Sequence, residues 1–197
     1  MAFELVKEEE WKRFVKAQEG PYYHENEKRL PTYKELSQLD MPCRSTMRSA
    51  GYDFRIPYDL KVKAGEAYIV GTGVKWDSQD ACLSHMKKMI TCNGDLYGFS
   101  QEPDVRTEQT YLALYPRSSY GFKYGFQLLN TTGIIDADYY SNPENDGHIM
   151  VGFTATKDME LKAGDKFCQG IITTYFICSD EDAPTSVRTG GTGSTGK

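Results

Sequence analysis

Short apolar runs separated by turn residues dominate the chain from about residue 49 onward. The runs are rich in β-branched and aromatic residues, and Gly, Pro, Asn and Asp lie between them. They span residues 67–74, 110–115, 149–156 and 167–177. This pattern is typical of strands joined by tight turns. Many short strands with little helix predict an all-β sandwich or barrel.

The first 40 residues follow a helical pattern instead. Over residues 3–19, large apolar residues share one helical face, and acidic and basic residues stand four positions apart elsewhere. The apolar face consists of Trp11, Phe14 and Val15. A capping box from Thr32 to Glu35 predicts a second short helix that ends near Leu39. We interpret residues 1–40 as an appendage, either a packing arm, which is the better default, or an element that binds a partner.

Two segments depart from the strand pattern. Residues 78–109 contain a candidate short helix over 81–90 and a polar loop, so we expect an insertion between strands. Residues 186–197 are rich in Gly, Ser and Thr and lack the apolar area needed to fold alone, so we expect a flexible tail. The sequence is thus divided into a helical appendage (1–40), a β domain (41–185) and the tail.

Composition narrows the class of protein. A chain of 197 residues suits one domain, and its net charge of −5 argues against a nucleic-acid binder. Without an apolar run of membrane-spanning length or an apolar signal core, we expect a cytoplasmic protein that binds no membrane. An odd count of five cysteines favours free thiols. The spacing of Cys82, His85 and Cys92 fits no common zinc pattern, so ordinary thiols are the preferred interpretation.

Five short segments hold residues that serve packing poorly. They are Ala-Gly-Tyr-Asp (50–53), Pro-Arg-Ser-Ser-Tyr-Gly (116–121), and the polar stretches 130–139, 164–169 and 188–196. Each alone can be a turn, a surface ion pair or a disordered tail. Together they supply carboxylates for a metal ion and for water activation, and Arg, Ser and Gly for phosphates. The G-x-x-x-x-G-K match at the C-terminus lacks the strand and helix of a P-loop, which excludes that reading.

The order and spacing of these segments resemble the five motifs of the trimeric dUTPase family. The resemblance covers about residues 42–77 and 110–197, and its glycine-rich last segment is the most specific part. It implies a β-clip or jelly-roll barrel and Mg²⁺-dependent hydrolysis of dUTP to dUMP and pyrophosphate. It also implies a homotrimer in which three subunits build each site.

The resemblance assigns chemical roles to five residues. Asp136 would be the general base for the water that attacks the α-phosphorus, with Arg117 supporting it. Asp53 would hold waters on the Mg²⁺, and Ser118 would stabilise charge near the α–β bridging oxygen. Tyr139 would lie under the deoxyribose and exclude a 2′-hydroxyl.

The resemblance also implies a set of substrate-binding residues. Asn130 and the hairpin backbone up to Asp136 would read uracil, and Arg188 would close over the γ-phosphate. Thr192 stands where the family usually has an aromatic residue. Besides Tyr139, the implied set is Ser119, Asn130, Gly133, Ile135, Gln169, Arg188, Gly193, Ser194 and Thr195.

Two alternatives remain open at the level of sequence. A dCTP deaminase shares this fold, but it uses a glutamate base near the third motif and does not need the glycine-rich segment. A non-catalytic regulatory relative could use the extra helices and the insertion as its contact surface. The presence of Asp53, Asp136 and Arg188 argues against lost activity.

Overall fold

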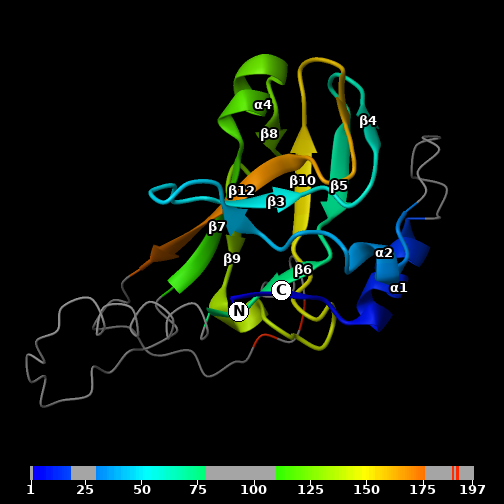
Figure 1. The fold of residues 1–197 in the computed structure, drawn as a ribbon, viewed down its shortest axis with the longest axis vertical. Helices are drawn as coiled ribbons and strands as arrows, with labels where there is room; N and C mark the ends of the chain where they lie inside the picture. The colour runs from blue at the N-terminus through cyan, green and yellow to red at the C-terminus, as the bar shows by residue number, and fades with distance from the viewer. Residues whose placement is uncertain (1, 19–29, 79–109, 176–187, 189, 191–197) are drawn as a thin grey trace, which may run out of the picture.

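The computed structural model describes residues 2–18, 30–78, 110–175, 188 and 190, which are mostly β-structure (Figure 1). The strands are β1 (Phe3–Leu5), β2 (Cys43–Arg44), β3 (Tyr52–Arg55), β4 (Leu60–Val62), β5 (Ala67–Gly71), β6 (Val74–Trp76), β7 (Thr110–Pro116), β8 (Gln127–Leu128), β9 (Gly133–Ile135), β10 (Met150–Thr154), β11 (Met159–Leu161) and β12 (Lys166–Thr174). The helices are α1 (Glu8–Ala17), α2 (Tyr33–Leu36), α4 (Ser118–Tyr124) and the 3₁₀ turn η2 (Ala137–Tyr139). None of the helices in these ranges is long and apolar enough to cross a membrane.

Two antiparallel sheets form the body of the protein. One has the strand order β2-β3-β12-β7-β9 and the other the order β5-β10-β8. The pairs β4-β11 and β1-β6 extend this framework. In the larger sheet β12 lies between β3 and β7 and is hydrogen-bonded to both (Figure 1). The all-β, jelly-roll-like fold expected from the sequence is confirmed.

The core lies between the two sheets and is rich in aromatic rings. Phe54 and Phe167 come from the larger sheet, and Phe153 comes from the smaller one; all three are fully buried. Phe126, just before β8, stacks on Phe153 with ring centroids 4.4 Å apart. Each such ring contributes about 1.5–3 kcal/mol through burial, so this cluster is the main source of stability.

The N-terminal segment packs on the β body through a second, smaller core. Val6, Trp11 and Phe14 are buried against Leu36 of α2. The turn between β5 and β6 accommodates α2, because a Cβ at Gly73 would approach the Leu36 side chain to 2.5 Å. Figure 1 shows α1 and α2 together at this side of the molecule, away from α4.

The structure confirms some element boundaries and corrects others. The predicted capping box is present, with Thr32 as N-cap, but α2 ends at Leu36 rather than near Leu39. Residues 3–5 were expected to be helical and instead form β1, because they pair with β6 and Phe3 packs against the rings of β3. The run 67–74 is divided into β5 and β6 by a turn.

Several expectations fall on residues outside the described ranges. They concern the insertion and its candidate helix (81–90), the thiols Cys82 and Cys92 with His85, and most of the C-terminal tail. Of residues 186–197, the structure describes Arg188 and Gly190.

Candidate active site

Two clusters of charged side chains lie at opposite ends of β7. The strand is followed directly by Arg117 and α4. Its antiparallel neighbour β9 pairs Ile135 with Leu112, which places Asp136 level with Tyr111. Arg117 and Asp136 of one chain are therefore separated by about 20 Å along the strand direction. Within one chain this distance is too long for Arg117 to support Asp136, so the role that the resemblance gives Arg117 stays a prediction and needs residues from two subunits.

The first cluster surrounds Asp53, a buried residue of β3. Its Oδ1 lies 3.1 Å from the Arg117 Nε, and its Oδ2 lies 3.0 Å from the Lys166 Nζ. The Ser45 hydroxyl donates to the same Oδ2 at 2.5 Å and accepts from the Lys166 Nζ at 2.7 Å. Both oxygens of Asp53 are thus occupied, and its two cationic neighbours leave one positive charge in excess.

The surroundings of Asp53 favour its ionised form. Burial alone would raise the pKa of Asp53. The hydrogen bonds from Ser45 and Lys166, together with the charge of Arg117, outweigh burial and hold the pKa below its ordinary value. The carboxylate is therefore charged throughout the neutral range, and it orients both cations.

Gln169 adds an amide to the first cluster. The register of β12 places it opposite Asp53 on one side and Tyr115 on the other. Its Nε2 donates to the carbonyl of Pro116 at 3.1 Å. A side chain at position 51 would collide with the Gln169 amide, so only Gly51 leaves room for it. The first and fourth segments therefore meet at this point.

Ser118 and Ser119 follow Arg117 and form the first turn of α4. Both are exposed, so their hydroxyls are accessible to a ligand next to the first cluster. The structure thus gathers candidate residues from the first, second and fourth segments at one end of the larger sheet.

The second cluster is built on Asp136, which follows β9 and begins η2. The Arg188 guanidinium forms a short ion pair with Asp136 and a second contact, at 3.1 Å, with Asp138. The same guanidinium lies over the Tyr139 ring, 5.6 Å from its centroid. The third and fifth segments, 50 residues apart in sequence, therefore meet here.

The surroundings of Asp136 act on its proton affinity in the opposite direction from those of Asp53. Partial burial raises the pKa of Asp136, and the nearby charge of Asp138 adds to this. The Arg188 guanidinium opposes both but does not cancel them. A carboxylate with a raised pKa is a stronger base, which is what proton abstraction from water requires.

Tyr139 is a buried ring with a fixed hydroxyl. The hydroxyl donates to the carbonyl of His148 at 3.2 Å and accepts from the Asn145 side-chain amide at 2.6 Å. Burial raises the pKa of Tyr139, so the hydroxyl keeps its proton at neutral pH. The ring can therefore present one constant face beside Asp136.

The hairpin before Asp136 holds the residues implied in base recognition. Asn130 is exposed in the turn, where Thr131 has a positive φ of 63°. Gly133 is buried, and a Cβ there would lie 3.1 Å from Leu114 on β7. Gly133 and Ile135 belong to β9, whose pairing with β7 fixes the hairpin backbone. Gly193, Ser194 and Thr195 lie outside the described residues.

Sequence reasoning missed Ser45 and Lys166. Both lie in or near the recognised segments, but neither was given a role. Lys166 stands two positions before Cys168 and three before Gln169 in the fourth segment, so a charged residue at the start of a buried strand was the available signal. Ser45 gave no such signal, because only the pairing of β2 with β3 brings it to Asp53.

Comparison with known proteins gives the class of this chain. The dUTPase family model matches residues 37–87. The crystal structure of the dUTPase from Streptococcus mutans has a similar fold, with a TM-score of 0.55, 25% identity, and coverage of 90% of this chain and 98% of that one. The fold and site therefore define a jelly-roll-like protein of the dUTPase type.

Similarity to curated relatives is extensive along the chain. The deoxyuridine 5'-triphosphate nucleotidohydrolase of Lactococcus lactis is 32% identical over 161 residues, covering 80% of this chain and 89% of the relative. The protein of the same name from Nautilia profundicola is 27% identical over 169 residues, covering 83% and 96%. The chain belongs to the dUTPase family.

The first cluster makes a prediction about stability. At about pH 7, Asp53→Asn should cost roughly 1–3 kcal/mol of unfolding free energy, because Arg117 and Lys166 lose their counter-ion. The pKa of Asp53 is lowered by folding, so its contribution is complete above the unfolded-state pKa of about 3.9 and is lost as the pH falls through the folded-state pKa. Urea denaturation at about pH 7 and about pH 3 should show the difference shrinking.

A control for this prediction is Asp40→Asn, which removes an exposed carboxylate paired with Arg55 at 3.0 Å. It should change stability by less than about 1 kcal/mol. An Asp53→Asn cost that stays the same at both pH values would contradict the ionic role of Asp53.

The second cluster makes a prediction about proton affinity. The Asp136 carboxyl should titrate above the ordinary aspartate range in ¹³C NMR, and Arg188→Gln should raise its pKa further, since the guanidinium favours the ionised form. Arg44→Gln is the control, because within the described ranges the hydrogen bonds of the Arg44 guanidinium go to carbonyls of its own hairpin. An Asp136 pKa that Arg188→Gln leaves unchanged or lowers would show that the ion pair does not form in solution.

Proposed function

We propose that this chain hydrolyses dUTP to dUMP and pyrophosphate. The observation that carries the proposal is Asp136, a carboxylate with a raised pKa that lies beside Arg188 and the buried Tyr139. Relatives with this family membership carry the name deoxyuridine 5'-triphosphate nucleotidohydrolase. Membership of the dUTPase family indicates dUTP as the substrate, and the surroundings of Asp136 indicate that its carboxylate is the general base.

Asp136 acts as the general base in this proposal. Its carboxylate accepts a proton from a water molecule, and the water oxygen forms a bond to the α-phosphorus. The bond from that phosphorus to the α–β bridging oxygen breaks, so pyrophosphate leaves and dUMP remains. Arg188 first pairs with Asp136 and can exchange this contact for the γ-phosphate, because a guanidinium binds phosphate with charge-assisted hydrogen bonds.

The phosphate side of the site comes from the first cluster. Arg117 and Lys166 outnumber the single charge of Asp53, so the cluster attracts an anion. Ser118 stabilises charge near the bridging oxygen, and Ser119 and the Gln169 amide contact the phosphates.

The two clusters belong to one site only if different subunits supply them. Arg117 and Asp136 of one chain are at opposite ends of β7, too far apart to act on one phosphate. A symmetric homotrimer brings the Arg117 end of one subunit to the Asp136 end of the next. We therefore propose a homotrimer with shared sites, in which the tail completes the site over the γ-phosphate.

Magnesium fits this arrangement as an ion that the triphosphate brings. Among the described residues no group of three or more His, Cys, Asp or Glu side chains could hold a metal. Both oxygens of Asp53 are already occupied, so contact with the ion through water suits this residue better than direct coordination. When bound, Mg²⁺ would neutralise phosphate charge.

In this proposal the hairpin before Asp136 binds the base, and Tyr139 contacts the sugar. Asn130 and the backbone of Gly133 to Ile135 offer fixed hydrogen-bonding groups to uracil, because pairing with β7 holds this strand. The Tyr139 ring packs under the deoxyribose and crowds a 2′-hydroxyl.

A pyrophosphate-release assay tests this function. With Mg²⁺ the protein should hydrolyse dUTP in strong preference to dCTP, dTTP and UTP, and Asp136→Asn should lower kcat by about 10²–10⁴-fold. Near-normal turnover by that variant would refute the role of Asp136. Ammonia release from dCTP would indicate the deaminase alternative, and no turnover of any nucleotide would indicate a regulatory relative.

Mixed trimers test whether sites are shared. Asp136→Asn and Arg117→Gln should each be nearly inactive alone. Co-expressed in equal amounts with different tags, they should regain about a quarter of wild-type activity, since that fraction of sites combines an intact Asp136 with an intact Arg117. Mixed trimers that are isolated through both tags and remain inactive would contradict shared sites.

A further inference from the structure

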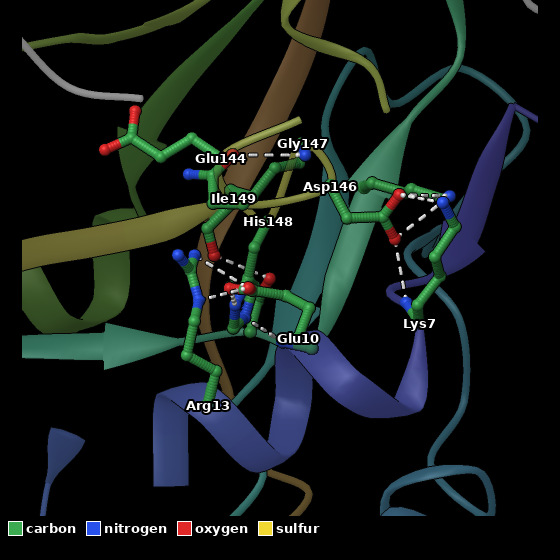
Figure 2. A network of polar contacts seen from close by, with 12 residues as sticks. Lys7, Glu10, Arg13, Glu144, Asp146, Gly147, His148 and Ile149 are labelled. Atoms are coloured by element: carbon green, nitrogen blue, oxygen red, sulfur yellow. Dashed lines mark hydrogen bonds and ion pairs between the residues drawn. The ribbon is translucent and has the colours of Figure 1, made fainter. Parts of the chain in front are cut away.

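The buried face of α1 carries a carboxylate among its apolar residues. Glu10 is 7% exposed and His148 is fully buried, and the Glu10 Oε1 lies 3.1 Å from the His148 Nδ1 (Figure 2). The other carboxylate oxygen accepts from Arg13, the next turn of the helix, at 2.7 and 2.8 Å. The rings of Trp11 and Phe14 flank the histidine ring, with centroids 5.9 and 5.3 Å from its own. A polar contact thus stands at the centre of the second core.

His148 connects this contact to the candidate active site. Its Nε2 accepts a hydrogen bond from the backbone N–H of Gly73 at 2.9 Å, so the ring proton lies on Nδ1 and is donated to Glu10. The backbone carbonyl of His148 accepts the Tyr139 hydroxyl at 3.2 Å. One residue therefore binds α1 through its side chain and Tyr139 through its backbone.

The N-terminal segment holds the same loop at two other points. The backbone N–H of Lys7 donates to Asp146 at 2.8 Å, and Asp146 also pairs with the buried Lys75 at 3.2 Å. The Tyr140 hydroxyl donates to Glu4 at 2.8 Å. The loop that carries Tyr139 is therefore attached to β1 and α1.

The loop between Tyr139 and His148 is tightly packed, so the positions of these two residues depend on each other. Gly147 has a φ of 78°, and a Cβ there would lie 2.8 Å from the Tyr139 carbonyl. The Asn142 side chain donates to that carbonyl at 2.8 Å and accepts from the backbone of Asn145 at 3.1 Å. A shift of His148 would therefore displace Tyr139.

Docking of the helix alone does not require this polar contact. A buried carboxylate and imidazole pay a desolvation penalty, and an apolar pair of similar volume would hold α1 at least as well. The polar pair instead gives His148 one orientation.

We propose that Glu10 and His148 are positioning residues for Tyr139, and that through Tyr139 they set the discrimination between dUTP and UTP. The inference rests on the proposed function, in which the Tyr139 ring crowds the 2′ position. Residues of the N-terminal helix then determine substrate specificity without touching the nucleotide.

The main test is Glu10→Leu, which places an apolar side chain of similar size against Trp11 and Phe14 and removes the acceptor for His148. The ratio of kcat/KM for dUTP to kcat/KM for UTP should fall by about tenfold, because the Tyr139 ring would no longer be held in the position that crowds a 2′-hydroxyl. Glu10→Gln keeps an acceptor oxygen at the same reach and should retain most of the ratio. Glu8→Ala, on the exposed face where Glu8 pairs with Lys12, should leave the ratio unchanged.

A double-mutant cycle shows whether Glu10 acts through Tyr139. Tyr139→Phe keeps the ring and removes the hydroxyl that His148 holds, so it should narrow the ratio by itself. Adding Glu10→Leu to Tyr139→Phe should then have little further effect, because the two changes break one connection. Thermal melts of all variants ensure that each is assayed folded.

Three outcomes overturn the inference. They are a wild-type ratio in Tyr139→Phe, a wild-type ratio in folded Glu10→Leu, and fully additive effects in the cycle. A wild-type ratio in Tyr139→Phe overturns the inference even where Glu10→Leu does not fold, and in that case Glu10→Ala takes its place in the cycle. Absence of dUTP hydrolysis by the wild-type protein would instead contradict the proposed function, so the two failures are distinguishable.

Discussion

The pairing of β12 with both β3 and β7 determines where the charged side chains of this protein lie. Gln169 sits opposite Asp53 on one side and Tyr115 on the other, which brings the end of β7 to the buried aspartate. A slip of one residue would turn every side chain of β12 to the opposite face. Gly170 helps to prevent this, because a Cβ there would lie 2.9 Å from Leu112 and Phe54.

The pairing of β7 with β9 places Asp136 at the other end of the sheet from Asp53, and the two carboxylates have different surroundings. Asp53 lies among Arg117, Lys166 and Ser45, and these partners lower its pKa despite burial. Partial burial raises the pKa of Asp136, the charge of Asp138 adds to this, and the single cation Arg188 does not cancel the two effects. In the proposed function, these opposite shifts make Asp53 the ionised anchor and Asp136 the base.

Much of the fold could be predicted from local sequence, since alternation and turn residues act over a few positions. The strands β7, β10 and β12 and the Thr32 cap of α2 follow from such signals. β1 could not be predicted, because residues 3–5 have a helical pattern and become a strand only through pairing with β6. The run 67–74 is divided at the turn around Gly73, which has a φ of 72° and lies against the Leu36 side chain.

The candidate site shows the same division between local and tertiary information. Motifs indicated Asp53, Arg117 and Asp136, since these residue types at that spacing suit phosphate chemistry. They did not indicate that Arg117 lies beside Asp53 and far from Asp136 of the same chain, because only strand register shows this.

The N-terminal segment extends this argument beyond the motifs. Glu10 reads as one acidic residue of a run in the first turn of a helix, and nothing in its sequence neighbourhood separates it from the exposed Glu8 and Glu9. Its partner His148 is 138 residues away. A motif defines the residue that contacts the ligand, whereas the partners that hold that residue can lie anywhere in the chain. In the proposed positioning of Tyr139 these partners are His148 and, on the N-terminal helix, Glu10, and both lie outside the five recognised segments.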